Sequence, residues 1–184
     1  MAKRKPTTID CDPFPSLSWR NGYWTCQDVI PGWAGFHSFE TGDRSDGSIT
    51  MTLPTNDKTR SSPTKSQVAA YKYVRRNATR IAAAIRKRIF REYAELQARY
   101  AEFVTPTEMP DILEPDDLND LIGFSAVHFH RAAKDGVGYA GIHLDCTWDA
   151  EHALGFMVHK TRVVEFGGVE TAILEWIAEA DSKR

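Results

Sequence analysis

The chain has 184 residues, of which 42% are apolar and 26% charged. A chain of this length can bury roughly 70% of the surface that its unfolded form exposes, which excludes a disordered chain and a miniature disulfide or metal scaffold. We therefore expect one domain over residues 1–184. Three scattered cysteines, no apolar run after the basic N-terminus and no stretch of about 18 apolar residues predict a cytoplasmic protein with no membrane partner.

The first third of the chain predicts short strands. Residues 1–18 are polar and contain prolines, which is typical of an N-terminal arm. Residues 19–54 are rich in aromatic side chains, carry the hairpin-turn pair Asn21-Gly22, and end in a polar/apolar alternation before Pro54. This pattern favours small antiparallel strands.

Residues 66–104 predict a long helix. Apolar side chains recur there every three or four positions, which defines one face of an α-helix. If the apolar face is continuous over about 36 residues, the helix would reach roughly 54 Å, longer than a domain of this size usually needs. We therefore expect a bend or break between Asn77 and Thr79.

The last part of the chain changes to the period of strands. Residues 123–167 contain four apolar runs joined by tight turns, which indicates antiparallel strands, and residues 168–180 follow as a C-terminal amphipathic helix. The fold class predicted is α+β. We expect an antiparallel sheet with the long helix and the C-terminal helix packed on one face.

Histidines of the predicted strands offer a metal-site hypothesis. His128 and His130 share one face of a strand, and His143 and Asp145 can join them from the next strand. Three imidazoles and a carboxylate suit zinc or another divalent ion. The same residues also suit a solvated or partner-facing sheet surface, which we favour, so we predict no metal and no cofactor.

A second cluster of polar residues lies in the segment from Trp148 to His152. Asp149, Glu151 and His152 are close enough in sequence for acid/base work or cation binding. The alternative is a structural turn in which Asp149 accepts hydrogen bonds from following amides while Trp148 packs on the core. We favour the turn and assign no catalytic residue, since no serine or cysteine sits in a nucleophile-elbow context.

This segment also carries a resemblance. Cys146-Thr-Trp-Asp-Ala-Glu-His-Ala-Leu-Gly155 resembles the C-terminal W-D-x-E-H-x-L-G signature of an uncharacterised bacterial domain family. Members of that family are sometimes grouped with immunity proteins of bacterial toxin systems, which implies binding rather than catalysis. The family usually has glycine where this chain has Ala153, which implies that the turn tolerates a Cβ atom here.

Charge is distributed unevenly along the chain. The formal net charge is −2, but residues 1–103 hold 17 cationic and 10 anionic residues, whereas residues 104–184 hold 6 and 15. Within residues 72–91, the helical stretch has no carboxylate and carries eight cations: Lys72, Arg75, Arg76, Arg80, Arg86, Lys87, Arg88 and Arg91. Such a helix can bind nucleic acid or an anionic membrane surface. It can equally be a solvated face whose arginines pair with Glu92 and Glu95, or pack near the acidic segment 108–120.

These patterns lead to one preferred function and two alternatives. We predict a non-enzymatic, immunity-like protein-binding domain whose acidic surface, at 108–120 or around Asp149 and Glu151, complements a basic partner such as a nuclease toxin. The alternatives are a metal-dependent enzyme using the His128/His130/His143 face and a nucleic-acid-binding module on the basic helix. Candidate interaction residues are Trp148, Asp149, Glu151, His152, Arg76, Arg80 and Arg88. Oligomeric state stays open.

Overall fold

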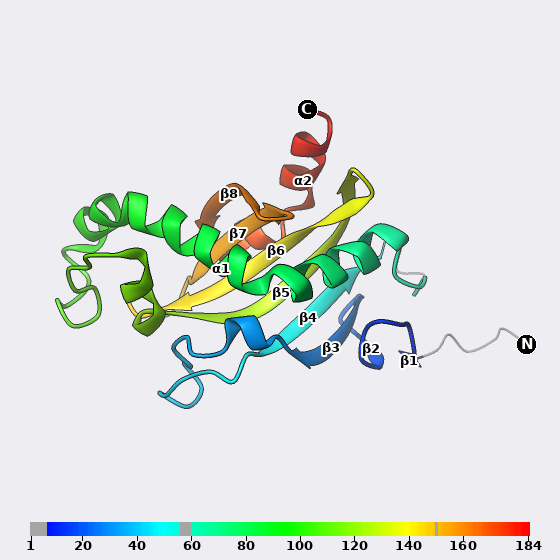
Figure 1. Cartoon of the computed structure of the whole chain (residues 1–184), viewed down its shortest axis with the longest axis horizontal. Helices are drawn as coiled ribbons and strands as arrows, with labels where there is room; N and C mark the ends of the chain where they lie inside the picture. Colours follow the sequence, from blue (N-terminus) through cyan, green and yellow to red (C-terminus); the bar gives the residue numbers. More distant parts are fainter. Residues whose placement is uncertain (1–6, 56–59, 150) are drawn as a thin grey trace, which may run out of the picture.

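The computed structural model describes residues 7–55, 60–149 and 151–184. Eight strands form one sheet whose spatial order follows the chain (Figure 1). Neighbouring strands are antiparallel except for β4 and β5, which run parallel. The strands are β1 (Thr8–Ile9), β2 (Leu17–Arg20), β3 (Tyr23–Val29), β4 (Ser48–Pro54), β5 (Ile122–Lys134), β6 (Val137–Cys146), β7 (Leu154–His159) and β8 (Arg162–Gly168).

Two α-helices and three short 3₁₀ helices accompany the sheet. The 3₁₀ helices are η1 (Pro31–Trp33), η2 (Pro115–Asp120) and η3 (Val169–Ala172); the α-helices are α1 (Lys65–Tyr100) and α2 (Glu175–Ser182). The predicted α+β class is confirmed. Within the described residues, no helix is long and apolar enough to cross a membrane.

Helix α1 begins at a capping box and bends where the sequence indicated. Thr64 caps the helix by accepting a hydrogen bond from the Gln67 amide, and the Gln67 amide side chain donates to the carbonyl oxygens of Pro54 and Phe129. Asn77 has non-helical backbone angles (φ −117, ψ 18), and its side-chain nitrogen donates to the Tyr73 carbonyl, 3.0 Å away. This local competition for a helical acceptor explains the bend.

The apolar side of α1 crosses one face of the sheet and forms the main core with it (Figure 1). Ile85 and Ile89 of α1 and Val127 and Ile142 of the central strands are fully buried there. Because side chains alternate along a strand, the intervening residues of β5 and β6 point to the other face. Those residues include the histidines.

The second helix lies on that other face. Ile177 and Ala178 of α2 form a separate small core with Tyr139 of β6 and Met157 of β7. Tyr139 alternates with residues that face α1, so the expectation that both helices pack on one face is wrong in this detail. The chain reaches the face opposite α1 through η3. There the Ala172 carbonyl oxygen forms a hydrogen bond with His130 Nε2, 2.8 Å away.

Candidate functional site

The histidines singled out in the sequence share the sheet face opposite α1, and two of them have separate hydrogen-bond partners. His128 Nδ1 lies 2.5 Å from the Thr52 hydroxyl oxygen, and His130 is buried beneath η3. His143 Nε2 lies 3.5 Å from Asp145 Oδ1 without forming a hydrogen bond. In the part of the chain that the structure describes, no three His, Cys, Asp or Glu side chains are grouped to hold a metal ion.

Burial keeps these imidazoles neutral. Desolvation, together with the nearby His130 and His143, lowers the pKa of His128 to about 4. Desolvation also lowers the pKa of His130 and of His143. Neutral rings held one by one against the sheet are suited to stabilising it and presenting a polar surface, rather than to sharing one ion.

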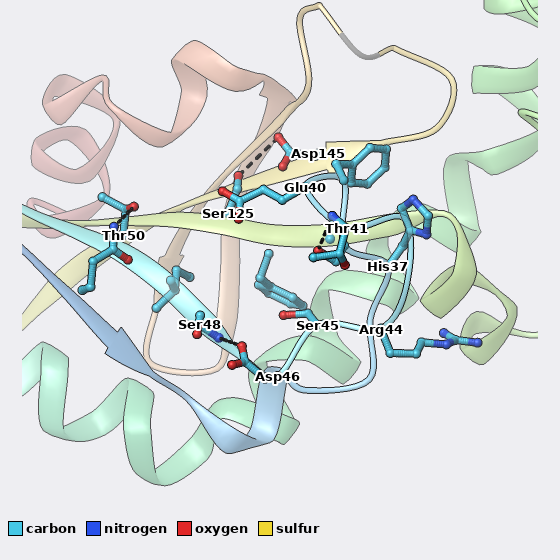
Figure 2. Close-up of a pocket in the computed structure, with 16 residues that line it drawn as sticks. His37, Glu40, Thr41, Arg44, Ser45, Asp46, Ser48, Thr50, Ser125 and Asp145 are labelled. Carbon is cyan, nitrogen blue, oxygen red and sulfur yellow. Dashed lines mark hydrogen bonds between the residues drawn. The ribbon is translucent and has the colours of Figure 1, made fainter.

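Beside this face lies a polar cavity of about 540 Å³ (Figure 2). One wall is the loop of residues 37–46, and the floor is made by β4 and the first part of β5. The loop sits directly on β5, since a Cβ atom at Gly123 would overlap the carbonyl oxygen of His37. Glycine at this position therefore lets the loop backbone close the cavity against the sheet.

The cavity contains three carboxylates: Glu40, Asp46 and Asp145. Asp145 accepts a hydrogen bond from the Ser125 hydroxyl, 3.3 Å away, and Asp46 accepts one from the Ser48 amide, 2.8 Å away. Hydrogen bonds from Ser48 lower the pKa of Asp46, so it stays ionised. Figure 2 shows Glu40, Ser125 and Asp145 around the same part of the cavity.

Arg44 is a cavity cation whose guanidinium is engaged elsewhere. It forms an ion pair with Asp120 and donates to the carbonyl oxygens of Gly35 (2.9 Å) and Asn119 (3.3 Å). In Figure 2 its side chain points away from Ser125 and Asp145. The three carboxylates of the cavity are thus left without a matching cation among the described lining residues.

Ser125, Asp145 and His143 are three residue types found in hydrolases, but their order differs from a catalytic triad. In such a triad the imidazole stands between the hydroxyl and the carboxylate and takes the hydroxyl proton. Here the carboxylate of Asp145 stands between Ser125 Oγ and His143 Nε2, at 3.3 and 3.5 Å. The serine therefore has no imidazole base, and the arrangement suits hydrogen bonding to a ligand.

The segment from Trp148 to His152 is built as a turn. Trp148 is 3% exposed and packs edge-on against Tyr93. Asp149 Oδ1 accepts from the amide and ring of His152, each at 3.0 Å, and its Oδ2 accepts from the Tyr100 hydroxyl at 2.7 Å. Of the predicted interaction residues here, Trp148 and Asp149 are occupied internally, while Glu151 and His152 are exposed.

Most cations of the basic helix form no ion pair with the described residues. Arg76 and Arg80 are exposed, whereas Arg88 pairs with Glu92. The expected Arg91–Glu95 pair is absent from the ion pairs of the described residues, and Arg86 alone of the eight cations reaches the acidic segment, at Asp116 (2.8 Å).

The cavity residues Glu40, Asp46 and Ser125 were missed in the sequence. Glu40 and Asp46 belong to an irregular loop, and Ser125 lies at the register shift of β5 between Phe124 and Ala126. No fixed spacing links them to Asp145, so no local motif could have indicated the cavity.

The fold defines an α+β protein with one long helix on an eight-stranded, largely antiparallel sheet. The chain belongs to the family described as a domain of unknown function (DUF6985), which matches residues 25–174. No curated protein matches the chain. No solved structure matches it either.

Proposed function

We propose that the protein is a non-enzymatic protein-binding domain of a bacterial cytoplasm, immunity-like in its action, and that its polar cavity receives cationic side chains of a basic partner such as a nuclease toxin. The bacterial and immunity-like parts rest on the resemblance of the segment from Cys146 to Gly155. The binding mode rests on the cavity.

The observation that carries the proposal is the charge inside the cavity. Glu40, Asp46 and Asp145 line it, while the guanidinium of Arg44 is already held by Asp120 and two carbonyl oxygens. Lysine or arginine side chains of a partner would supply the missing positive charge. Complementary charge of this kind speeds association and selects against acidic partners.

The acidic surfaces suggested by the sequence are weaker candidates than the cavity. In the segment 108–120, Asp116 pairs with Arg86, Asp120 pairs with Arg44, and Asp117 accepts from the amides that precede η2. Asp149 is likewise bound to Tyr100 and His152. Asp116 and Asp120 are thus neutralised by arginines, whereas no carboxylate of the cavity pairs with a lysine or arginine of the described residues.

A binding role is also supported over a metal-dependent enzyme by the separation of the imidazoles. His128 contacts Thr52, His130 contacts the Ala172 carbonyl and His143 lies beside Asp145. A catalytic metal site needs three protein ligands converging on one point. Separate partners for each ring favour a surface that binds.

The test is direct binding to the protein encoded by the neighbouring gene, measured by titration calorimetry. We expect a stoichiometric complex that the double variant Glu40→Gln/Asp145→Asn weakens at least tenfold, mainly through slower association. The matched control is Glu95→Gln/Glu179→Gln, which removes the same charge from exposed positions outside the cavity. Equal weakening by both variants, or none by either, would overturn the assignment of the cavity.

A further inference from the structure

Five cations of α1 form a single line on its outer side. We call Lys72, Arg76, Arg80, Lys87 and Arg91 the α1 cationic stripe. Counted on a regular 3.6-residue helix, their spacings of four, four, seven and four residues place them within an arc of roughly 100°. The bend at Asn77 falls between Arg76 and Arg80 of this arc. This arc lies opposite the buried positions such as Ile81 and Ile85, and all five residues are exposed.

The cations of the stripe form no ion pair with the described residues. The other three cations of this stretch have partners: Arg75 contacts Asp28 at 2.5 Å, Arg86 contacts Asp116 at 2.8 Å and Arg88 pairs with Glu92. Across residues 7–55, 60–149 and 151–184, none of the five stripe residues forms an ion pair. Folding thus uses the flanking cations and leaves the central line available to an anionic ligand.

The residues between the stripe cations indicate which anionic ligand fits. Of the other residues inside the arc, Ala83 is exposed, whereas Tyr73 and Phe90 lie at the two edges of the arc and are half-buried, Phe90 against the main core. A protein partner would need buried aromatic or large apolar anchors at the centre of its interface, and the centre of the arc has none. A single-stranded nucleic acid would need exposed aromatic rings for base stacking, and these are also missing from the arc.

We propose that the α1 cationic stripe binds the phosphate backbone of double-stranded DNA without reading its sequence. The stripe spans about 29 Å at 1.5 Å per residue. The major groove of B-form DNA, about 12 Å wide, admits a helix with phosphates along both edges, whereas the major groove of A-form RNA is too deep and narrow. Arginine and lysine side chains supply the charge-assisted contacts to phosphate.

This surface is separate from the carboxylate cavity. Helix α1 covers one face of the sheet, whereas the cavity residues Ser125 and Asp145 project from the opposite face. DNA on the stripe would therefore not contact the carboxylates of the cavity. Failure of one proposal leaves the other intact.

The experiment measures fluorescence anisotropy of a labelled 20-base-pair DNA duplex with the full chain, at a series of salt concentrations. Five phosphate contacts predict a slope of about −4.5 for log K against log salt, so affinity falls on the order of 500-fold between 50 and 200 mM salt. The variant Arg76→Gln/Arg80→Gln should reduce the slope to about −2.7 and weaken binding at 50 mM salt on the order of 100-fold.

Two controls make the result specific. Lys183→Gln/Arg184→Gln removes the same charge from exposed positions at the C-terminus and should leave binding within about twofold of the unaltered chain. Thermal unfolding of both variants should match that of the unaltered chain, because the substituted side chains are exposed and make no ion pair in the described structure.

Three outcomes would overturn the proposal. They are no anisotropy change at 50 mM salt, equal weakening by the two double variants, and binding to poly-glutamate with the same dependence on Arg76 and Arg80 but none to DNA. The last result would assign the stripe to an acidic protein. Tighter binding to an RNA duplex of the same sequence would also contradict the major-groove argument.

Discussion

The Tyr100 hydroxyl donates a hydrogen bond to Asp149 Oδ2 across 2.7 Å, which joins the last residue of α1 to the connection between β6 and β7. Asp149 also holds the amide and the ring of His152. Although burial opposes the effect, these hydrogen bonds lower the pKa of Asp149. One carboxylate therefore ties the helix end and the turn together.

Removing either side of this contact should destabilise the fold to different degrees. We expect Tyr100→Phe to lower the free energy of unfolding by about 1 kcal/mol and Asp149→Ala to lower it by about 2–3 kcal/mol. The second loss is larger because the carboxylate accepts several hydrogen bonds, and its removal leaves all of those donors without an acceptor. Urea unfolding measures both. His152→Ala is the control and should cost little, because its side chain is 76% exposed. A double-mutant cycle without coupling between Tyr100 and Asp149 would contradict the role given to this bond.

Replacing Ala153 with glycine should stabilise the protein. Ala153 has φ +53, in the left-handed region that costs residues with a Cβ roughly 1–2 kcal/mol. The backbone at Ala153 is therefore strained by the Cβ atom. Ala153→Gly should relieve this strain and raise the free energy of unfolding by about 1 kcal/mol. The same change at Ala98, exposed within α1, should lower it by about 1 kcal/mol. A loss of stability at both positions would show that the turn is unstrained.

Stability should fall on acidification through the buried imidazoles. The pKa of His128 is lowered to about 4 by burial and by His130 and His143, while an unfolded histidine titrates near 6.5. The unfolded chain then binds more protons between these values, so this contribution is complete above about pH 6.5 and is lost as the pH falls toward 4. The loss is about 3 kcal/mol at most.

The measurement is the urea midpoint of the protein as a function of pH. His128→Asn keeps a polar atom near Thr52 but cannot be protonated, so its midpoint should change less between pH 6.5 and 4. An identical pH profile for the variant and the unaltered chain would show that other groups carry the acid sensitivity.

Gly141 should not accept a side chain. A Cβ atom there would overlap the Ala172 carbonyl oxygen and come within 2.9 Å of His130 Nε2. Gly141→Ala must therefore push η3 off the sheet, and we expect a loss of several kcal/mol, as for other overpacked interiors. Gly136→Ala is the comparison: its φ of +75 imposes strain, but its Cβ would meet open space, so the loss should be smaller. Thermal unfolding ranks the two.

Local periodicity was sufficient to predict the main elements but not their long-range arrangement. The bend at Asn77 and the turn at Asp149 follow from residues that compete with nearby backbone groups, so they were visible in the sequence. The parallel pairing of β4 with β5 could not be predicted from the sequence, because a helix and a long connection separate Pro54 from Ile122. Strand spacing carries no information about such a pairing.

The candidate cavity was hidden from the sequence for a related reason. Glu40 and Asp46 reach it from an irregular loop, and Ser125 reaches it beside a register shift in β5. The histidines, by contrast, were placed on the correct face, since alternation along a strand is a local property. Whether the cations of α1 would be paired depended on where folding placed Asp28 and Asp116.

The agreement between strand order and chain order has a consequence for synthesis on the ribosome. Each strand is followed along the chain by the strand it pairs with, but β4 must wait for β5 while α1 is made. During that interval the apolar side chains of β4, Ile49, Met51 and Leu53, would face water. Helix α1 is the next element to emerge and packs in the same core. It can therefore cover these apolar side chains before β5 is made.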